Sequence, residues 1–421
     1  MRGSFAALAI RNYAILWVGS LGSFTAFFMS TVVQSIVAFE LTGKNSAVGV
    51  VLLGQGLASA VLGPFGGAVA DRISKRLINA VCQSVITVVF LSIGTLIALD
   101  QIALFHLAAG SFVIGTMFAF MGPARQAWVV ELVGPELRAN AVALNQVALN
   151  AARIWAPALA GLMVAVAAIG AEGAYFAMAA LYAAVTLLLL MMPPSKPIPA
   201  IAGRSIFGDM IAGFRYVQHQ PRLRWMLTMF FVMIVLGLSS MTVLPGLLEN
   251  ELGQDVSKLG VIQTVNAVGG LIASLAVASI AGSPKALKVY SAGALLTGAA
   301  LVLTGLTPTF GFIFIPMLLT GIGTGAFQTL NGSVIVTEAD PAYYGRVISL
   351  TSLAFSGFML MGLPVGLAAD RWGERPTLVV LGATVMILVA IISPIIARAP
   401  HGVRHDEAPS EVAAGGGGSG S

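Results

Sequence analysis

The sequence has few charged residues. Asp, Glu, Lys and Arg make up only 9% of its 421 residues, whereas 57% are hydrophobic. Soluble domains carry about a quarter charged residues, so this composition cannot cover a water-facing surface. The hydrophobic residues form long continuous runs instead of alternating with polar ones, which favours membrane-spanning helices over a β-barrel. The sequence therefore predicts an all-α membrane protein.

Several kinds of chemistry lack the residues they need. Cys82 is the only cysteine and can form no internal disulfide, and the four His are too scattered for a metal site. No phosphate-cradling loop and no nucleophile–base pair can be read, so we expect no cofactor, no direct use of ATP and no enzyme activity. The net charge of +5 comes from bases in short loops between apolar runs, which does not indicate a nucleic-acid partner.

Twelve hydrophobic segments are long enough to cross a bilayer, which takes about 20 residues. They are 13–39, 47–70, 77–99, 103–124, 140–168, 174–192, 224–248, 258–281, 287–307, 311–335, 347–369 and 377–397. An even number puts both chain ends on one side. Most Lys and Arg residues then lie on that side, Arg125 among them, and only Lys44, Lys258, Arg371 and Arg375 lie on the other. The bias places both termini in the cytoplasm.

The longest polar interruption, 193–222, divides the chain into an N-terminal bundle (1–192) and a C-terminal bundle (223–398). Within it, 205–218 has hydrophobic residues at helical spacing, with Ser205 as a candidate N-cap. This pattern predicts an amphipathic helix on the cytoplasmic leaflet, and a plain linker helix fits equally well. The tail, 399–421, is predicted to be cytoplasmic, and its Gly/Ser-rich end resembles an artificial flexible linker.

The two halves repeat each other. Residues 46–50 are echoed by 257–261, and Gly115 by Gly321. Duplicated halves place a binding site at their interface and permit alternating access by rocking. The repeat therefore predicts two pseudo-symmetric bundles of six helices.

A short stretch after the second segment, 63–76, reads G-P-F-G-G-A-V-A-D-R-I-S-K-R. It resembles the signature of the major facilitator superfamily, which runs roughly Gly-x-x-x-Asp-Arg-x-Gly-Arg-Lys. The matching residues are Gly67, Asp71, Arg72, Lys75 and Arg76, and Ser74 replaces the last glycine. The equivalent loop at 282–285 has no acid, but a second match, 366–375, follows the eleventh segment.

The resemblance implies the major facilitator fold and a conformational latch in which Asp71 and its bases bind across the halves. Glu131 or Glu136 would complete a charge relay with Arg72 or Arg76. A solvated turn that only sets topology is the alternative.

The P-A-R-Q-A run at 123–127 and the G-F-R-Y run at 213–216 resemble one branch of the superfamily. That branch holds enterobactin-exporter-like carriers and drug–proton antiporters, with lysophospholipid flippases nearby. The resemblance implies a monomeric secondary transporter of the bacterial inner membrane that exports a drug-like molecule or a siderophore by proton antiport. A lipid flippase of the same fold and a membrane sensor or scaffold without transport are the alternatives.

Arg153 lies about 20 Å along the fifth predicted helix, near the bilayer centre. A charge there is costly and by default marks a functional site. Asn145, Gln146 and Asn150 lie on the preceding two turns and suggest a polar stripe facing a watery cavity. We expect Arg153 either to hold an anionic group of the cargo or to respond to a coupling proton elsewhere. A structural arginine satisfied by the carbonyls of broken helices is the alternative.

Other polar or aromatic residues within the segments are candidates for the cavity wall. They are Phe24, Phe27, Met29, Gln34, Gln55, Asn266, Gln328 and Asn331. Amides in lipid usually face protein or water, whereas the aromatics and Met29 fit plain packing as well. An amide and apolar lining suits an amphipathic organic molecule. Pro157 and Gly161, on the fifth segment, partly match the antiporter motif, in which small residues allow close helix packing and Pro157 kinks the helix. An ordinary proline kink is the alternative.

No Asp or Glu lies deep in any segment. Proton-driven carriers usually have a titratable residue there. Its absence weakens the prediction of proton antiport, although Asp71 or Glu131 could titrate when exposed to one side.

Overall fold

The computed structural model describes residues 3, 5–193, 195, 206–280, 283, 285–340 and 343–400. Over these residues the chain is helical and has no strand, and twelve helical stretches are long and apolar enough to cross a membrane. The predicted all-α fold is therefore confirmed. Ser205, the 401–421 part of the tail, and most of the 282–285 loop lie outside the described residues, and so do the side chain of Asp71 and the burial of Gly67.

The N-terminal bundle consists of six long helices and two short 3₁₀ turns. They are η1 (Ala6–Ala9), α1 (Arg11–Glu40), α2 (Asn45–Arg72), α3 (Lys75–Ala98), α4 (Leu104–Glu131), η2 (Pro135–Leu137), α5 (Arg138–Ala165) and α6 (Gly170–Leu190). Buried aromatic rings join α3 to α6: Phe90 meets Tyr175 and Tyr182 edge-on, with ring centroids 5.8 and 5.7 Å apart. Such edge-to-face pairs add to the burial of apolar area in holding the bundle together.

The C-terminal bundle has a less regular start. Its elements are α8 (Pro221–Val232), η3 (Met233–Gly237), η4 (Ser240–Thr242), α9 (Leu244–Gly246), η5 (Leu247–Glu251), η6 (Val256–Lys258), α10 (Leu259–Ala278), α11 (Ala286–Gly305), α12 (Phe310–Glu338), α13 (Tyr344–Trp372) and α14 (Glu374–Arg398). The predicted continuous helix 224–248 is thus broken by π and 3₁₀ turns. Ser239 and Ser240 donate their hydroxyls to the carbonyls of Val235 and Gly237, which competes with regular α-helical bonding. Pro245 also has no N–H to donate.

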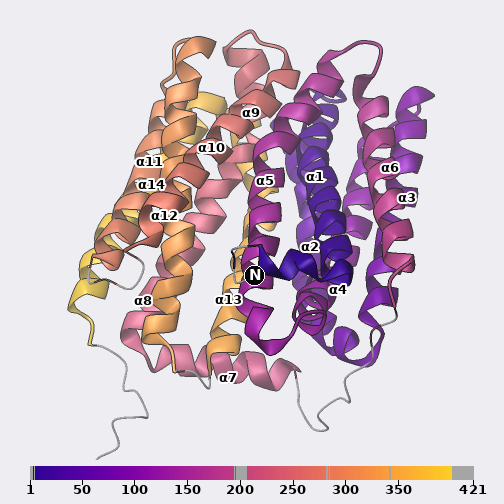
Figure 1. The fold of residues 1–421 in the computed structure, drawn as a ribbon. Helices are drawn as coiled ribbons and strands as arrows, with labels where there is room; N and C mark the ends of the chain where they lie inside the picture. The colour runs from indigo at the N-terminus through magenta and orange to yellow at the C-terminus, as the bar shows by residue number, and fades with distance from the viewer. Residues whose placement is uncertain are drawn as a thin grey trace, which may run out of the picture.

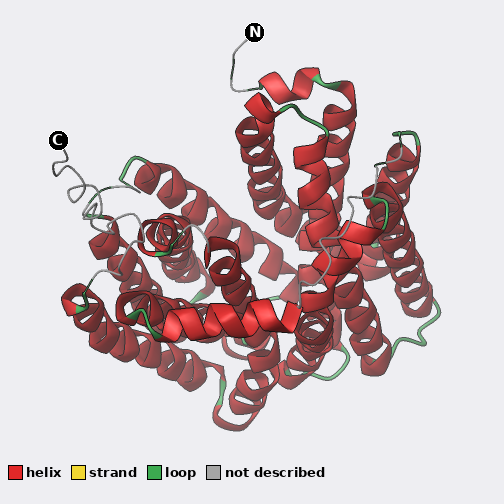
Figure 2. Ribbon diagram, turned by 90° about the horizontal axis from the view of Figure 1, so that it is seen from below, coloured by secondary structure: helices red, strands yellow, loops and turns green. Residues whose placement is uncertain are grey.

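The amphipathic helix is present as α7 (Ile206–Gln218), which lies across the lower ends of the long helices (Figure 1) and is the horizontal helix nearest the viewer in Figure 2. Tyr216 stacks on Tyr343 at 4.2 Å between ring centroids, and its hydroxyl accepts a hydrogen bond from the N–H of Asp340. Ile211 and Phe214 are more than half exposed. α7 is therefore anchored on the α12–α13 connection while it presents apolar side chains outward, as an interfacial helix does.

Two faces of the molecule are distinguished below. The α7 face is the end at which α7 lies, α2 ends and α3 begins; the opposite face is the other end of the bundles.

The bundles meet through α2 against α13 and α5 against α10. Gly49 in α2 is so close to α13 that a Cβ added to Gly49 would lie 2.6 Å from the Cα of Leu363. Glycine at these crossings lets the helix backbones approach closely.

The predicted repeat is visible in the packing. Gly115 of α4 lies against the backbone of Gln55 in α2, and Gly321 of α12 lies against the backbone of Asn266 in α10. These four residues occupy equivalent places in the two halves of the sequence. The same helix crossing is therefore built twice, once in each bundle.

Candidate functional site

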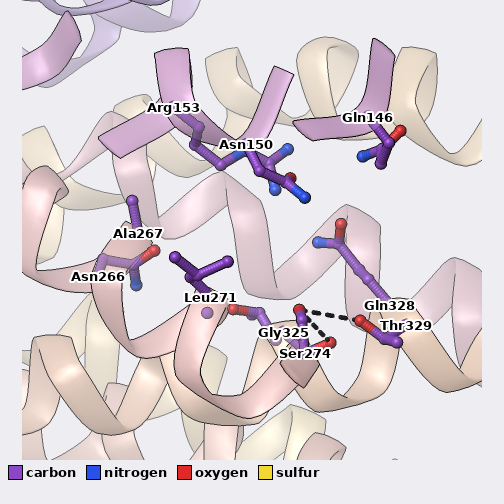
Figure 3. A pocket seen from close by; sticks show the side chains of 12 residues that line it. Gln146, Asn150, Arg153, Asn266, Ala267, Leu271, Ser274, Gly325, Gln328 and Thr329 are labelled. Carbon is purple, nitrogen blue, oxygen red and sulfur yellow. Dashed lines mark hydrogen bonds between the residues drawn. The ribbon is translucent and has the colours of Figure 1, made fainter. Parts of the chain in front are cut away.

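A cavity of about 400 Å³ lies between the two bundles. Three helices form its wall: α5 from the N-terminal bundle, and α10 and α12 from the C-terminal bundle. The lining residues are Gln146, Asn150, Arg153, Asn266, Ala267, Gly270, Leu271, Ser274, Thr324, Gly325, Gln328 and Thr329. Five of them belong to the predicted polar set: Gln146, Asn150, Arg153, Asn266 and Gln328. The structure brings these five together around one cavity (Figure 3).

Arg153 contributes the only charge among the lining residues. Its side chain is exposed to the cavity, and its guanidinium carbon lies 5.6 Å from the centroid of the Phe28 ring in α1. Within the part of the chain that the structure describes, no carboxylate pairs with it. The guanidinium is held by a cation–π contact and keeps its hydrogen-bond donors free.

The neutral polar groups of the cavity fall into two sets. Asn266 donates to the carbonyl of Met317 at 3.3 Å, and Thr329 donates to the hydroxyl of Ser274 at 2.9 Å, so these side chains are held by the protein. The amides of Gln146, Asn150 and Gln328 form no hydrogen bond with other described residues. These three amides and Arg153 are therefore available to a ligand.

Several predicted wall residues pack inside the N-terminal bundle instead. Gln34 is buried and accepts a hydrogen bond of 2.9 Å from the hydroxyl of Ser111. Gln55 is buried at the α2–α4 crossing, although its repeat partner Asn266 does line the cavity. Asn145 keeps its amide oxygen buried, and Met29 belongs to the core. A buried amide that satisfies a neighbouring helix gives the same sequence signal as one that faces water.

The remaining candidates also have partners elsewhere. Phe27 packs on Phe118 in α4, with ring centroids 4.6 Å apart. Asn331 is buried and accepts a hydrogen bond of 3.2 Å from the hydroxyl of Tyr290. It lines a second, smaller hollow of about 260 Å³ within the C-terminal bundle, not the cavity between the bundles.

Phe24 lies beside a buried arginine that the sequence analysis placed in a loop. Arg125 is inside α4 and only 4% exposed, because α4 continues to Glu131 instead of ending at 124. Its guanidinium lies 5.6 Å from the Phe24 ring and donates to Asn79 at 3.3 Å and Ser23 at 3.2 Å. Arg125 is therefore part of a polar network within the N-terminal bundle. Ser23 and Asn79, polar residues inside the first and third predicted segments, were a signal in the sequence that could have found it.

The predicted latch has a different pairing from the one favoured by the sequence. Glu131 pairs with Lys75, with 2.9 Å between Oε2 and Nζ, and not with Arg72 or Arg76. The contact is an ion pair without directional hydrogen-bond geometry. Arg76 instead donates to the carbonyl of Met192, and Arg72 is exposed. Lys75 and Glu131 join α3 to α4, so this pair stabilises the N-terminal bundle internally.

A cross-bundle network occupies the opposite face, and we call it the outer clamp: Asn45, Ser46, Gly246, Asn250, Asp370 and Glu374. The carboxylate of Asp370 accepts hydrogen bonds from the backbone N–H groups of Asn45, at 2.7 Å, and Ser46, at 3.1 Å. These are the first two residues of α2, whose own preceding residue, Lys44, provides no side-chain cap. Asp370 therefore caps a helix of the other bundle, where a negative charge is also favoured by the helix dipole.

The side chain of Asn45 extends the clamp. Its Nδ2 donates to Glu374 at 2.9 Å, and its Oδ1 accepts from the N–H of Gly246 at 3.1 Å. Asn250 donates to the same oxygen of Glu374 at 2.7 Å. Glu374 is buried, so these donors replace the water that its carboxylate loses. One signal for the clamp was visible in the sequence, the second motif match at 366–375.

The cavity and the clamp lie at different depths. Along α5, the lining residues 146–153 come before Pro157 and Gly161, where α5 crosses α10 at Ser257 and Gly260. α5 begins at the α7 face and ends at the opposite face. The tight α5–α10 crossing and the outer clamp therefore both lie between the cavity and the opposite face.

Comparisons with known proteins agree with this architecture. Residues 2–414 match the family described as transmembrane secretion effectors. Macrolide efflux protein A of Streptococcus pyogenes is 25% identical over 399 residues, which cover 91% of this chain and 96% of the relative. The staphyloferrin A transporter of Staphylococcus aureus is 25% identical over 378 residues, covering 89% and 91%. The enterobactin exporter EntS of Shigella flexneri is 24% identical over 289 residues, covering 68% and 67%.

Solved structures share the fold at lower identity. The nucleoside transporter NupG matches with a TM-score of 0.70 and 15% identity, over 91% of this chain and 98% of NupG. A bacterial homologue of the human lysosomal transporter Spinster, in an inward-facing and unoccupied conformation, matches with a TM-score of 0.71 and 14% identity, over 94% and 98%.

Proposed function

The chain belongs to the major facilitator superfamily of membrane transporters, and we propose that it is a secondary active exporter of an amphipathic organic compound, either drug-like or a siderophore. The observation that carries the proposal is the cavity between the two bundles, where Arg153 and three unpaired amides face one space. A site at the interface of duplicated halves is where rocking of one half against the other changes access. Relatives named as a macrolide efflux protein, a staphyloferrin A transporter and an enterobactin exporter support the proposal that the chain exports such a compound.

We assign the α7 face to the cytoplasm of a bacterial inner membrane, because Lys and Arg residues concentrate at that end of the helices. With this orientation, the outer clamp closes the extracellular side and the cavity belongs to the cytoplasmic side. A cargo molecule enters from the cytoplasm, and release outside requires the Asn45–Asp370 and α5–α10 contacts to separate. The α2–α3 connection, with Asp71 and Arg72 in the last turn of α2, then closes the cytoplasmic side.

Protons are the proposed coupling ion. The carboxylates in position for this role are at the gates: Glu131 beside Lys75 on the cytoplasmic side, and Asp370 and Glu374 on the extracellular side. Asp370 and Glu374 are bonded across the two bundles to Asn45, which must move away when the extracellular side opens, whereas Glu131 and its partner Lys75 belong to the same bundle. Protonation would weaken those bonds, which links proton entry to opening.

Proteoliposomes with and without a pH gradient test the proposal, with amphipathic dyes compared against a fluorescent lysophospholipid. We expect dye transport that increases several-fold with the gradient. Movement of the lysolipid but not of the dyes would show that the protein is a lipid flippase. No transport of either class, with the protein folded and inserted, would favour a sensor or scaffold.

A further inference from the structure

We propose that the cavity is selective for organic anions and binds a carboxylate group of its cargo on the guanidinium of Arg153. This inference rests on the proposed transport function and adds the chemical class of the cargo to it. Three features of the cavity carry it: the charge of the walls, the geometry around Arg153, and the neutral groups that face it.

The walls carry one uncompensated positive charge. The sequences of α5 and α10 contain no Asp or Glu, and α12 contains only Glu338, at its last residue. Glu338 is already paired with Arg222, at 3.1 Å. A charge in surroundings of low polarity acts more strongly on another charge than it does in water. The cavity therefore attracts an anion and repels a cation.

The geometry around Arg153 favours a carboxylate. The guanidinium carbon of Arg153 lies 5.6 Å from the centroid of the Phe28 ring, and its N–H groups donate to no other described residue. An arginine edge matches a carboxylate with two parallel hydrogen bonds. Asn150 lies one turn earlier on α5, and Figure 3 shows its amide beside Arg153. Its N–H donors can reach the same anionic group.

The rest of the cavity provides neutral polar groups. Gln146 on α5 and Gln328 on α12 have amides that form no hydrogen bond with other described residues and can bond hydroxyl, amide or further carboxylate oxygens of a cargo. A cavity of about 400 Å³ matches a small organic molecule and is smaller than a whole phospholipid. The cargo class that fits is a small organic acid with a polar, partly apolar body.

Binding to the purified protein in detergent tests the inference without requiring transport. Two dyes with the same three-ring skeleton serve as probes: 5-carboxyfluorescein, an anion at pH 7.4, and rhodamine 123, a cation. We expect the wild-type protein to bind carboxyfluorescein at least tenfold more tightly than rhodamine 123, because hydrogen bonds between charged groups add at least this factor in affinity. This comparison needs no variant. Equal binding of the two dyes, or tighter binding of rhodamine 123, would overturn the inference.

Variants locate the effect on Arg153. Arg153→Gln removes the charge and should weaken carboxyfluorescein binding tenfold or more without weakening rhodamine 123 binding. Arg153→Lys keeps the charge but lacks the two parallel N–H donors of the guanidinium. Its affinity for carboxyfluorescein should therefore lie between those of the wild type and Arg153→Gln. Arg138→Gln, at the exposed start of α5 and outside the cavity, is the matched control and should bind like the wild type. Unchanged anion affinity in a folded Arg153→Gln protein contradicts the assignment.

Dye movement in proteoliposomes separates this inference from the proposed function. If carboxyfluorescein binds through Arg153 but neither dye moves, the transport function fails and the anion site stands. If rhodamine 123 moves and carboxyfluorescein does not, the transport function stands and the anion inference is wrong.

Discussion

The backbone N–H of Asn45 donates a hydrogen bond of 2.7 Å to the carboxylate of Asp370, 325 residues later in the chain. One bundle thus supplies the N-cap that a helix of the other bundle lacks. The contact between the bundles at the opposite face therefore also completes the first turn of α2. Separating the bundles there would leave two N–H groups of α2 to water, so a helix cap stabilises this contact.

Replacing Asp370 should open the opposite face. Losing an N-cap costs about 0.5–2 kcal/mol, which shifts the populations about 2- to 30-fold. Asp370→Ala should act more strongly than Asp370→Asn, which keeps one acceptor oxygen. Spin labels on cysteines at Lys44 and Thr309, both exposed on this face, report the change as longer distances in a Cys82→Ala background. Arg371→Gln, an exposed neighbour, is the control; a distance distribution unchanged by Asp370→Ala would contradict the clamp.

A side chain at Gly260 should have a similar effect through packing. A Cβ there would overlap the carbonyl oxygen of Pro157 in α5, so α5 and α10 could no longer approach each other at the opposite face. We expect Gly260→Ala to lengthen the same spin-label distances and to slow transport. Gly63→Ala adds the same methyl group to α2, where no atom lies within 4 Å, and should behave like the wild type. If both variants changed the distances and transport equally, any added methyl group in these helices would have the same effect. That result would contradict a specific requirement for close packing at the α5–α10 crossing.

Breaking the Lys75–Glu131 pair should destabilise the N-terminal bundle. Lys75 is 1% exposed and Glu131 is 33% exposed, so Glu131→Gln leaves a buried, unpaired ammonium group. We expect a loss of about 3 kcal/mol, the low end for a broken buried pair, because Glu131 is partly solvated. Thermal unfolding in detergent measures it. Adding Lys75→Met to Glu131→Gln should recover most of the loss; a double variant less stable than Glu131→Gln alone would contradict the pairing.

Gln328 and Asn331 should give opposite phenotypes although they are one turn apart on α12. Gln328 faces the cavity with a free amide, so Gln328→Ala should raise the KM for transport several-fold and leave the unfolding temperature unchanged. Asn331 accepts from buried Tyr290, so Asn331→Ala should cost about 1–3 kcal/mol of stability. Transport kinetics and thermal unfolding of both proteins check this. A stability loss in Gln328→Ala with unchanged KM would remove Gln328 from the binding site.

The sequence by itself determined the fold class and the duplication, and it marked Arg153 as a candidate functional residue. Lipid offers no partner for backbone N–H and C=O groups, which leaves helices or a closed barrel, and the long continuous apolar runs decide for helices. The position of Arg153 within a span marked it because a charge there is costly in any packing.

Only the tertiary structure decided which polar residues share a space. Asn266 lines the cavity, and Gln55, its partner in the repeat, is buried against α4, because the rotation of each helix depends on its neighbours. The clamp between Asn45 and Asp370 and the pairing of Glu131 with Lys75 instead of Arg72 or Arg76 likewise depend on helices far apart in sequence. Hydropathy measures how costly a polar side chain is in lipid, but the partner that offsets the cost is set by packing.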